Sequence, residues 1–95
     1  MNKREIIKKI EMKKEILKRY GVKKIGIFGS FAKGKQHKKS DVDILVTFDK
    51  IEFDDYMDLI SFLERIFKRK VDLVIEKNLF PELKYVKNEA EYVRL

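Results

Sequence analysis

The sequence has 95 residues, a length that suits one folded domain spanning residues 1–95. It contains no cysteine, which excludes disulfides, thiolate metal sites and thiol nucleophiles. Hydrophobic residues make up 44% of it, yet no apolar run approaches the roughly 20 residues of a membrane span, so we expect a cytoplasmic protein without membrane contact.

Charge is distributed unevenly along the chain. Residues 1–40 carry 14 Lys and Arg against 3 Asp and Glu, while the whole chain has a net charge of +7. The first part therefore attracts anions, and the acidic residues cluster later. Lysine also serves solubility, so the charge alone does not establish a binding role.

Hydrophobic periodicity predicts the order helix, strand, loop, strand, helix, strand, helix. The predicted helices cover 3–20, 53–69 and 80–92, and the predicted strands cover 22–29, 41–48 and 70–76. Residues 30–40 predict one helical turn followed by an exposed basic loop. This order favours a small α/β (α+β) fold, with a mixed sheet of three or four strands whose helices cover one face.

The helix at 53–69 has an apolar face broader than one sheet needs. Leu59, Phe62 and Ile66 widen this face. We therefore expect part of it to dock a partner protein. Under this hypothesis, Phe62→Lys or Ile66→Glu disrupts complex formation.

Two aspartates stand at the start of the second predicted strand. Asp41 and Asp43 are two residues apart, so their side chains point to the same face of a strand. Paired carboxylates repel each other unless a cation lies between them. Oxygen ligands without nearby Cys or His favour Mg²⁺ or Mn²⁺ over zinc. Without other evidence, two solvated acids at a sheet edge would explain the pair equally well.

The end of the first predicted strand has the features of a phosphate-binding corner. Gly29 allows backbone N–H groups to approach a ligand, and Ser30 adds a hydroxyl at the start of a helical turn. Lys33 supplies a nearby positive charge. The segment lacks the Lys-Ser/Thr ending of a P-loop, which excludes that motif.

A third acid, Asp72, lies between Val71 and Leu73 in the last predicted strand. An acid inside an apolar strand is unusual and indicates either a functional site or a protected sheet edge. Gly29-Ser30 is separated from Asp41 by ten residues, 31–40. The combination of these features is more specific than any one of them.

The segment GSFAKGKQHKKSDVDILV resembles the Gly-Ser, ten residues, Asp-x-Asp signature of the DNA polymerase β-like nucleotidyltransferase superfamily. Within it, the chain is similar to the minimal nucleotidyltransferase (MNT) proteins, which are antitoxin partners of HEPN-domain toxins. The resemblance extends over nearly the whole chain. Many relatives have Arg where this chain has Lys33, and lysine cannot make a bidentate phosphate contact.

The resemblance implies the nucleotidyltransferase fold and a protein adenylyltransferase (AMPylation) activity. ATP, or another nucleoside triphosphate, would be held by Gly29 and Ser30, with Lys33 nearby. Asp41 and Asp43 would bind two Mg²⁺ ions. Asp72 would bind one of them and help deprotonate the attacking hydroxyl, a tyrosine of a cognate HEPN toxin, and pyrophosphate would leave.

Two other functions remain open from the residues. One is a non-catalytic module that blocks a toxin by contact, which the presence of all three acids disfavours. The other is a nucleic-acid-binding module, for which the chain lacks zinc ligands, RNP aromatics or an obvious helix-turn-helix. Tyr56, Tyr85 and Tyr92 could stack on a base, although at helical positions packing in the core or at its rim explains each of them better. Ser40 could close the basic loop through backbone bonds, and His37 is predicted to be solvated.

Overall fold

The N-terminal helical region forms two helices instead of the single helix predicted. In the computed structural model, which describes residues 1–50 and 52–95, α1 spans Lys3–Met12 and α2 spans Lys14–Arg19. The side chain of Asn2 caps α1 by accepting a hydrogen bond from the backbone N–H of Glu5 at 2.9 Å. The break falls at Lys13, whose backbone leaves the helical region at φ −113° and ψ 17°.

The sheet has four strands and is mixed, as predicted. The strands are β1 (Val22–Phe28), β2 (Val42–Phe48), β3 (Val71–Ile75) and β4 (Glu91–Val93), in the order β3-β2-β1-β4. β1 is antiparallel to both β2 and β4, whereas β2 and β3 are parallel. The parallel pair is joined by α4 (Phe53–Phe67), as a crossover connection requires.

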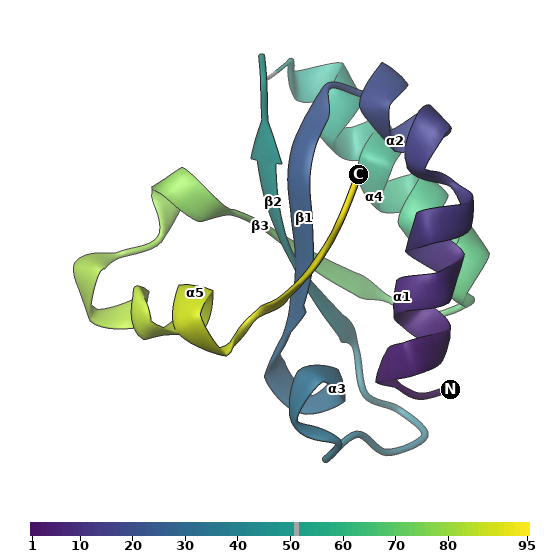
Figure 1. The fold of residues 1–95 in the computed structure, drawn as a ribbon, viewed down its shortest axis with the longest axis vertical. Coiled ribbons are helices and arrows are strands. Elements are labelled where there is room, and N and C mark those ends of the chain that lie inside the picture. The colour runs from purple at the N-terminus through teal and green to yellow at the C-terminus, as the bar shows by residue number, and fades with distance from the viewer. Residues whose placement is uncertain (51) are drawn as a thin grey trace.

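Three helices cover one face of the sheet. Ile25 and Ile27 of β1 and Ile44 and Val46 of β2 are completely buried in the core that these helices close. Figure 1 shows α1, α2 and α4 together on this side, with α5 (Tyr85–Glu89) on the other. Because side chains alternate along a strand, Asp43 lies on the face opposite Ile44. The acidic site therefore faces away from the three helices.

The expectation of a docking face on α4 is wrong for its central residue. Phe62 is only 8% exposed, because its ring packs against Tyr20 with centroids 5.9 Å apart. The wide apolar face of α4 is used twice, once against the sheet and once against the N-terminal helices. Ile66 is also partly buried against this core.

The C-terminal segment differs from the predicted helix 80–92. Short 3-10 turns at Glu76–Asn78 and Pro81–Leu83 precede α5, and the chain then enters β4. β4 completes the sheet by pairing with β1, which aligns Val93 with Ile25 and buries Val93. Pairing with an open sheet edge therefore overrides the helical pattern. In the described part of the chain, no helix is both long and apolar enough to cross a bilayer.

Candidate functional site

The site begins where β1 passes into a five-residue helix. α3 (Gly29–Lys33) follows Phe28 directly and is anchored by the fully buried Phe31. Gly29 has φ +73°, and a Cβ added there would overlap the carboxylate of Asp43. Glycine is thus required both for the left-handed backbone and for the space that the Asp43 side chain occupies.

Strand register brings the second acid beside the third. Asp43 pairs with Phe28 on the antiparallel side and with Asp72 on the parallel side. Asp41 precedes β2 by one residue and is exposed, so the predicted strand 41–48 is one residue too long. The structure therefore gathers the Gly29 corner and the acids at one end of the sheet.

The pKa of Asp43 reports this crowding. Burial, then the negative charge of Asp72, then that of Asp41 raise it from 3.8 to about 6. A carboxylate under these conditions favours either a proton or a cation beside it. Thus Asp43 is the residue at which a cation would relieve the most unfavourable charge.

The donor set fits a divalent cation that shares its ligands with a substrate. Among the described residues, no three His, Cys, Asp or Glu side chains are arranged to enclose one metal ion. Mg²⁺ commonly needs only one or two carboxylates, and it takes its other ligands from substrate phosphates and water. Asp41, Asp43 and Asp72 supply hard oxygen donors of this kind, and Asp43 lies directly against Gly29.

A hollow of about 480 Å³ extends from this centre under the C-terminal segment. Gly29, Lys33 and Asp72 line it on the sheet side. The opposite wall is mostly apolar and includes Phe80 and Tyr85, which are 70% and 54% exposed. An apolar wall beside a phosphate corner suits a nucleoside next to its phosphates.

Lys33, the predicted phosphate contact, forms an ion pair with Glu89 at 3.3 Å. It is half exposed and lines the same hollow. A triphosphate would have to compete with this carboxylate for the ammonium group. The predicted backbone closure of the basic loop is confirmed, because Ser40 Oγ accepts a hydrogen bond from the N–H of His37 at 2.9 Å.

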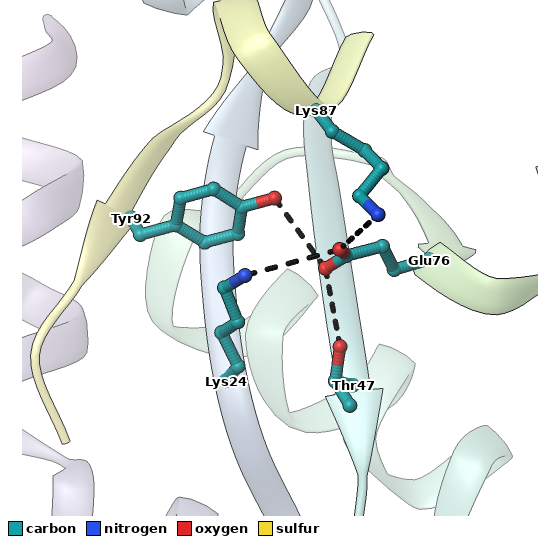
Figure 2. Close-up of polar contacts among 5 residues, drawn as sticks. All are labelled: Lys24, Thr47, Glu76, Lys87 and Tyr92. Atoms are coloured by element: carbon teal, nitrogen blue, oxygen red, sulfur yellow. Dashed lines mark hydrogen bonds and ion pairs between the residues drawn. The ribbon is translucent and has the colours of Figure 1, made fainter. Parts of the chain in front are cut away.

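A polar network that the sequence did not indicate holds the outer wall of the hollow. Figure 2 shows the carboxylate of Glu76 in polar contact with four side chains, those of Lys87 from α5, Lys24 from β1, Thr47 from β2 and Tyr92 from β4. Its carboxylate lies 3.2 Å from Lys87 Nζ, 3.8 Å from Lys24 Nζ and 3.2 Å from Thr47 Oγ1. The hydroxyl of Tyr92 donates at 3.4 Å. Only the acidic side chain directly after β3 hinted at this role.

Gly29→Ala tests the close approach of α3 to the acids. We expect it to destabilise the protein by about 2 to 4 kcal/mol, since it adds a steric overlap with Asp43 to the left-handed strain. Gly34→Ala is the matched control. Gly34 also has a positive φ, of +69°, but an added Cβ there meets nothing within 4 Å. Urea unfolding should show a loss of only about 1 kcal/mol for the control. Equal losses would mean that backbone strain alone explains the glycine.

The arrangement defines a class of protein. A glycine corner predicted to bind phosphate, in contact with one of three acids at one end of the sheet, is suited to metal-dependent transfer of a nucleotide. Comparison with known proteins agrees: residues 9–95 match the family model described as nucleotidyltransferase domain. The chain belongs to this family and is a nucleotidyltransferase enzyme.

Two curated archaeal proteins show how close the relationship is. One, from Methanocaldococcus jannaschii and provisionally named a protein adenylyltransferase, is 44% identical over 92 residues, which cover 93% of this chain and 87% of the relative. The other, protein adenylyltransferase MntA of Thermococcus cleftensis, is 41% identical over 83 residues, covering 85% and 84%. The resemblance to nucleotidyltransferases seen in the sequence is therefore confirmed.

Solved structures confirm the fold. A structure provisionally named a minimal nucleotidyltransferase superposes with a TM-score of 0.83 at 31% identity, covering 96% of this chain and 95% of the other. A toxin–antitoxin structure with AMP-PNP superposes with a TM-score of 0.73 at 24% identity, covering 90% and 70%. The four-stranded mixed sheet with its covering helices is thus the fold of this family.

Proposed function

We propose that this enzyme transfers AMP from ATP to a hydroxyl of a partner protein and releases pyrophosphate. The observation that best supports this proposal is the contact between Gly29 and Asp43, together with the pairing of Asp43 and Asp72 on neighbouring strands. It joins a phosphate corner and a pair of acids into one site. The names of the curated relatives support adenylyl transfer to a protein.

In this proposal the triphosphate lies at the start of α3, against Gly29 and Ser30, and the nucleoside enters the hollow beside Tyr85. Asp41 and Asp43 would hold two magnesium ions, one of which Asp72 would also bind, and manganese could substitute for magnesium. The bound metal supplies charge neutralisation on the phosphates and on the leaving pyrophosphate.

The remaining chemistry takes place at the acceptor hydroxyl. Asp72 accepts the proton of the attacking hydroxyl, whose oxygen bonds to the α-phosphorus as the bond from that phosphorus to the bridging oxygen breaks. Asp72 is suited to this role because it is exposed and adjacent in register to Asp43. A neutral hydroxyl needs such a base within hydrogen-bonding reach.

We further propose that the acceptor is a tyrosine of a cognate HEPN toxin, so that the enzyme acts as a cytoplasmic antitoxin. The family resemblance and the fold shared with a toxin–antitoxin structure containing AMP-PNP support this choice.

The test is transfer of label from α-labelled ATP to the protein encoded beside this gene. We expect incorporation that requires magnesium and stops with a chelator, with a mass gain of one or more adenylyl groups on tyrosine. The toxin activity of the partner protein should be measured in the same samples. Neutralisation without any incorporation would instead establish a contact-only antitoxin, and label on RNA would establish a nucleic-acid substrate.

A further inference from the structure

Asp72 lines the hollow of about 480 Å³ that receives the nucleotide in the proposed function, which we name the nucleotide hollow. A second hollow, of about 350 Å³, also borders the acidic site, and Asp41 lines it. Its walls are two basic segments, Lys38–Ser40 and Lys68–Lys70. We name it the basic hollow.

We propose that the basic hollow binds carboxylates of the acceptor polypeptide, so that the preferred acceptor hydroxyl is flanked by Asp or Glu. This inference rests on the proposed adenylyl transfer and specifies its substrate. In the proposed function the nucleotide occupies the nucleotide hollow, so the acceptor needs another surface beside the acids. The basic hollow, which Asp41 lines together with lysines, is such a surface.

The basic hollow is a built feature. Arg69 ties its two walls together by donating from Nη1 to the carbonyl of Lys38 at 2.8 Å and to that of Ser40 at 3.3 Å. The guanidinium also lies over the Phe31 ring at 5.4 Å. The two backbone segments that carry the lysines are therefore held together by the hydrogen bonds of Arg69.

The cations of the basic hollow form no ion pair in the part of the chain that the structure describes. The ion pairs found among residues 1–50 and 52–95 involve other lysines, and none involves Lys38, Lys39, Lys68, Arg69 or Lys70. Five positive groups against the single carboxylate of Asp41 repel one another. An anion of a partner would offset that repulsion.

Lys68 gives an independent indication. It has φ 55° and ψ 38°, and is the one non-glycine residue with positive φ in the described chain. A helix ending in this conformation favours glycine or asparagine. Lysine at this position strains the backbone, so a functional role of its side chain is a hypothesis that Lys68→Gly tests.

The chemistry of the lining favours a carboxylate over a nucleic acid. The lysines are point charges, and the one guanidinium bonds backbone carbonyls, so no free planar fork faces a phosphate. Single-stranded nucleic acid also needs aromatic side chains for stacking. The residues lining the basic hollow include no aromatic side chain.

Binding of short labelled peptides to the full chain tests the proposal. The probes are a peptide with one Tyr between Glu residues, its Gln counterpart, and an oligoadenylate of equal length. We expect the Glu peptide to bind about tenfold more tightly than the other two, and Lys68→Gly/Lys70→Ala to weaken it about tenfold. The control Lys14→Ala/Lys18→Ala removes the same charge from exposed positions of α2 and should change affinity less than about twofold.

Lys68→Gly alone separates binding from folding. Glycine relieves the strained conformation, so the melting temperature should not fall while the affinity for the Glu peptide does. An unchanged affinity would assign Lys68 no role in binding and overturn the proposal. Equal losses in the α2 control, or tighter binding of oligoadenylate, would overturn it as well.

Transfer kinetics distinguish this proposal from the adenylyl transfer on which it rests. With the cognate partner, Lys68→Gly/Lys70→Ala should lower kcat/KM for the partner about tenfold and leave the KM for ATP unchanged. Unchanged kcat/KM for the partner would overturn the basic hollow as the acceptor site. Absence of transfer by the wild-type chain would refute the proposed function, whereas the peptide measurements would still decide whether the basic hollow binds carboxylates.

Discussion

Asp43→Asn is expected to lower adenylyl transfer by at least about a thousandfold, since metal binding contributes several kcal/mol to such a reaction. Asp43 is central to the site: it contacts the Gly29 corner and pairs in register with Asp72. Asparagine keeps the size of the side chain but removes the charge. The measurement is the single-turnover rate of label transfer at saturating ATP and magnesium.

The same substitution should stabilise the metal-free protein at neutral pH. The pKa of Asp43 is raised from 3.8 to about 6 in the folded state, so its contribution to stability is present at low pH and is lost as pH rises through about 6. Thermal unfolding with a chelator should therefore show wild type losing stability between about pH 4 and 6, and Asp43→Asn losing less. Asp43→Asn should thus lower activity while raising stability, as is expected where function requires a destabilising arrangement of charges.

Asp58→Asn is the matched control, because Asp58 is exposed on α4. It should change neither the rate nor the pH dependence. Magnesium should raise the melting temperature of wild type at pH 8 and leave Asp43→Asn nearly unchanged. Retention of more than about a tenth of the transfer rate by Asp43→Asn would remove Asp43 from the metal site.

The sequence predicted the parts of the fold that depend on local pattern. Periodicity located β1, β2, β3 and α4 to within two residues at either end, because each has a strongly buried face. It joined α1 and α2, since Lys13 carries no breaking signal that would separate them. It missed β4, whose three residues become a strand only by pairing with the edge of β1.

The grouping of the candidate site residues could be predicted because most of them stand at fixed spacings within one sequence motif. Gly29, Ser30 and Asp41 follow one another along the chain, and Asp72 stands out as an acid in an apolar strand. Their roles in binding and catalysis stay predictions that the substitutions above test. The wall of the nucleotide hollow could not be predicted, since it depends on how the 3-10 turn Pro81–Leu83 and α5 lie over the sheet. That position is set by contacts between distant segments.

Glu76→Ala should lower the stability of the protein by about 2 to 4 kcal/mol. The side chain is only 11% exposed and accepts contacts from Lys24, Lys87, Thr47 and Tyr92. Removing it leaves two lysines and two hydroxyls without their shared acceptor. Urea unfolding of wild type and variant at neutral pH gives the difference.

The loss should depend on pH in a defined direction. Burial by itself raises the pKa of Glu76, but the hydrogen bond from Lys87, the charge of Lys24 and the hydroxyl of Thr47 lower it overall below 4.5. Its stabilising contribution is therefore present above pH 4.5 and is lost as pH falls through the folded-state pKa. Wild type and Glu76→Ala should converge in acid. As a control, Glu52→Ala removes an exposed pair with Lys50 and should change stability by less than about 0.5 kcal/mol.

Loss of Glu76 should also weaken nucleotide binding more than it slows transfer. Lys87 belongs to α5, whose Tyr85 and Val86 form the outer wall of the nucleotide hollow, while Asp43 and Gly29 are held by β1 and β2. Releasing α5 therefore loosens the wall and leaves the acids in place. We expect the KM for ATP to rise about tenfold with kcat within about threefold of wild type at a temperature where the variant is folded. Equal losses in both constants would mean that the acids depend on the C-terminal segment, and the site would then be one cooperative unit extending to β4.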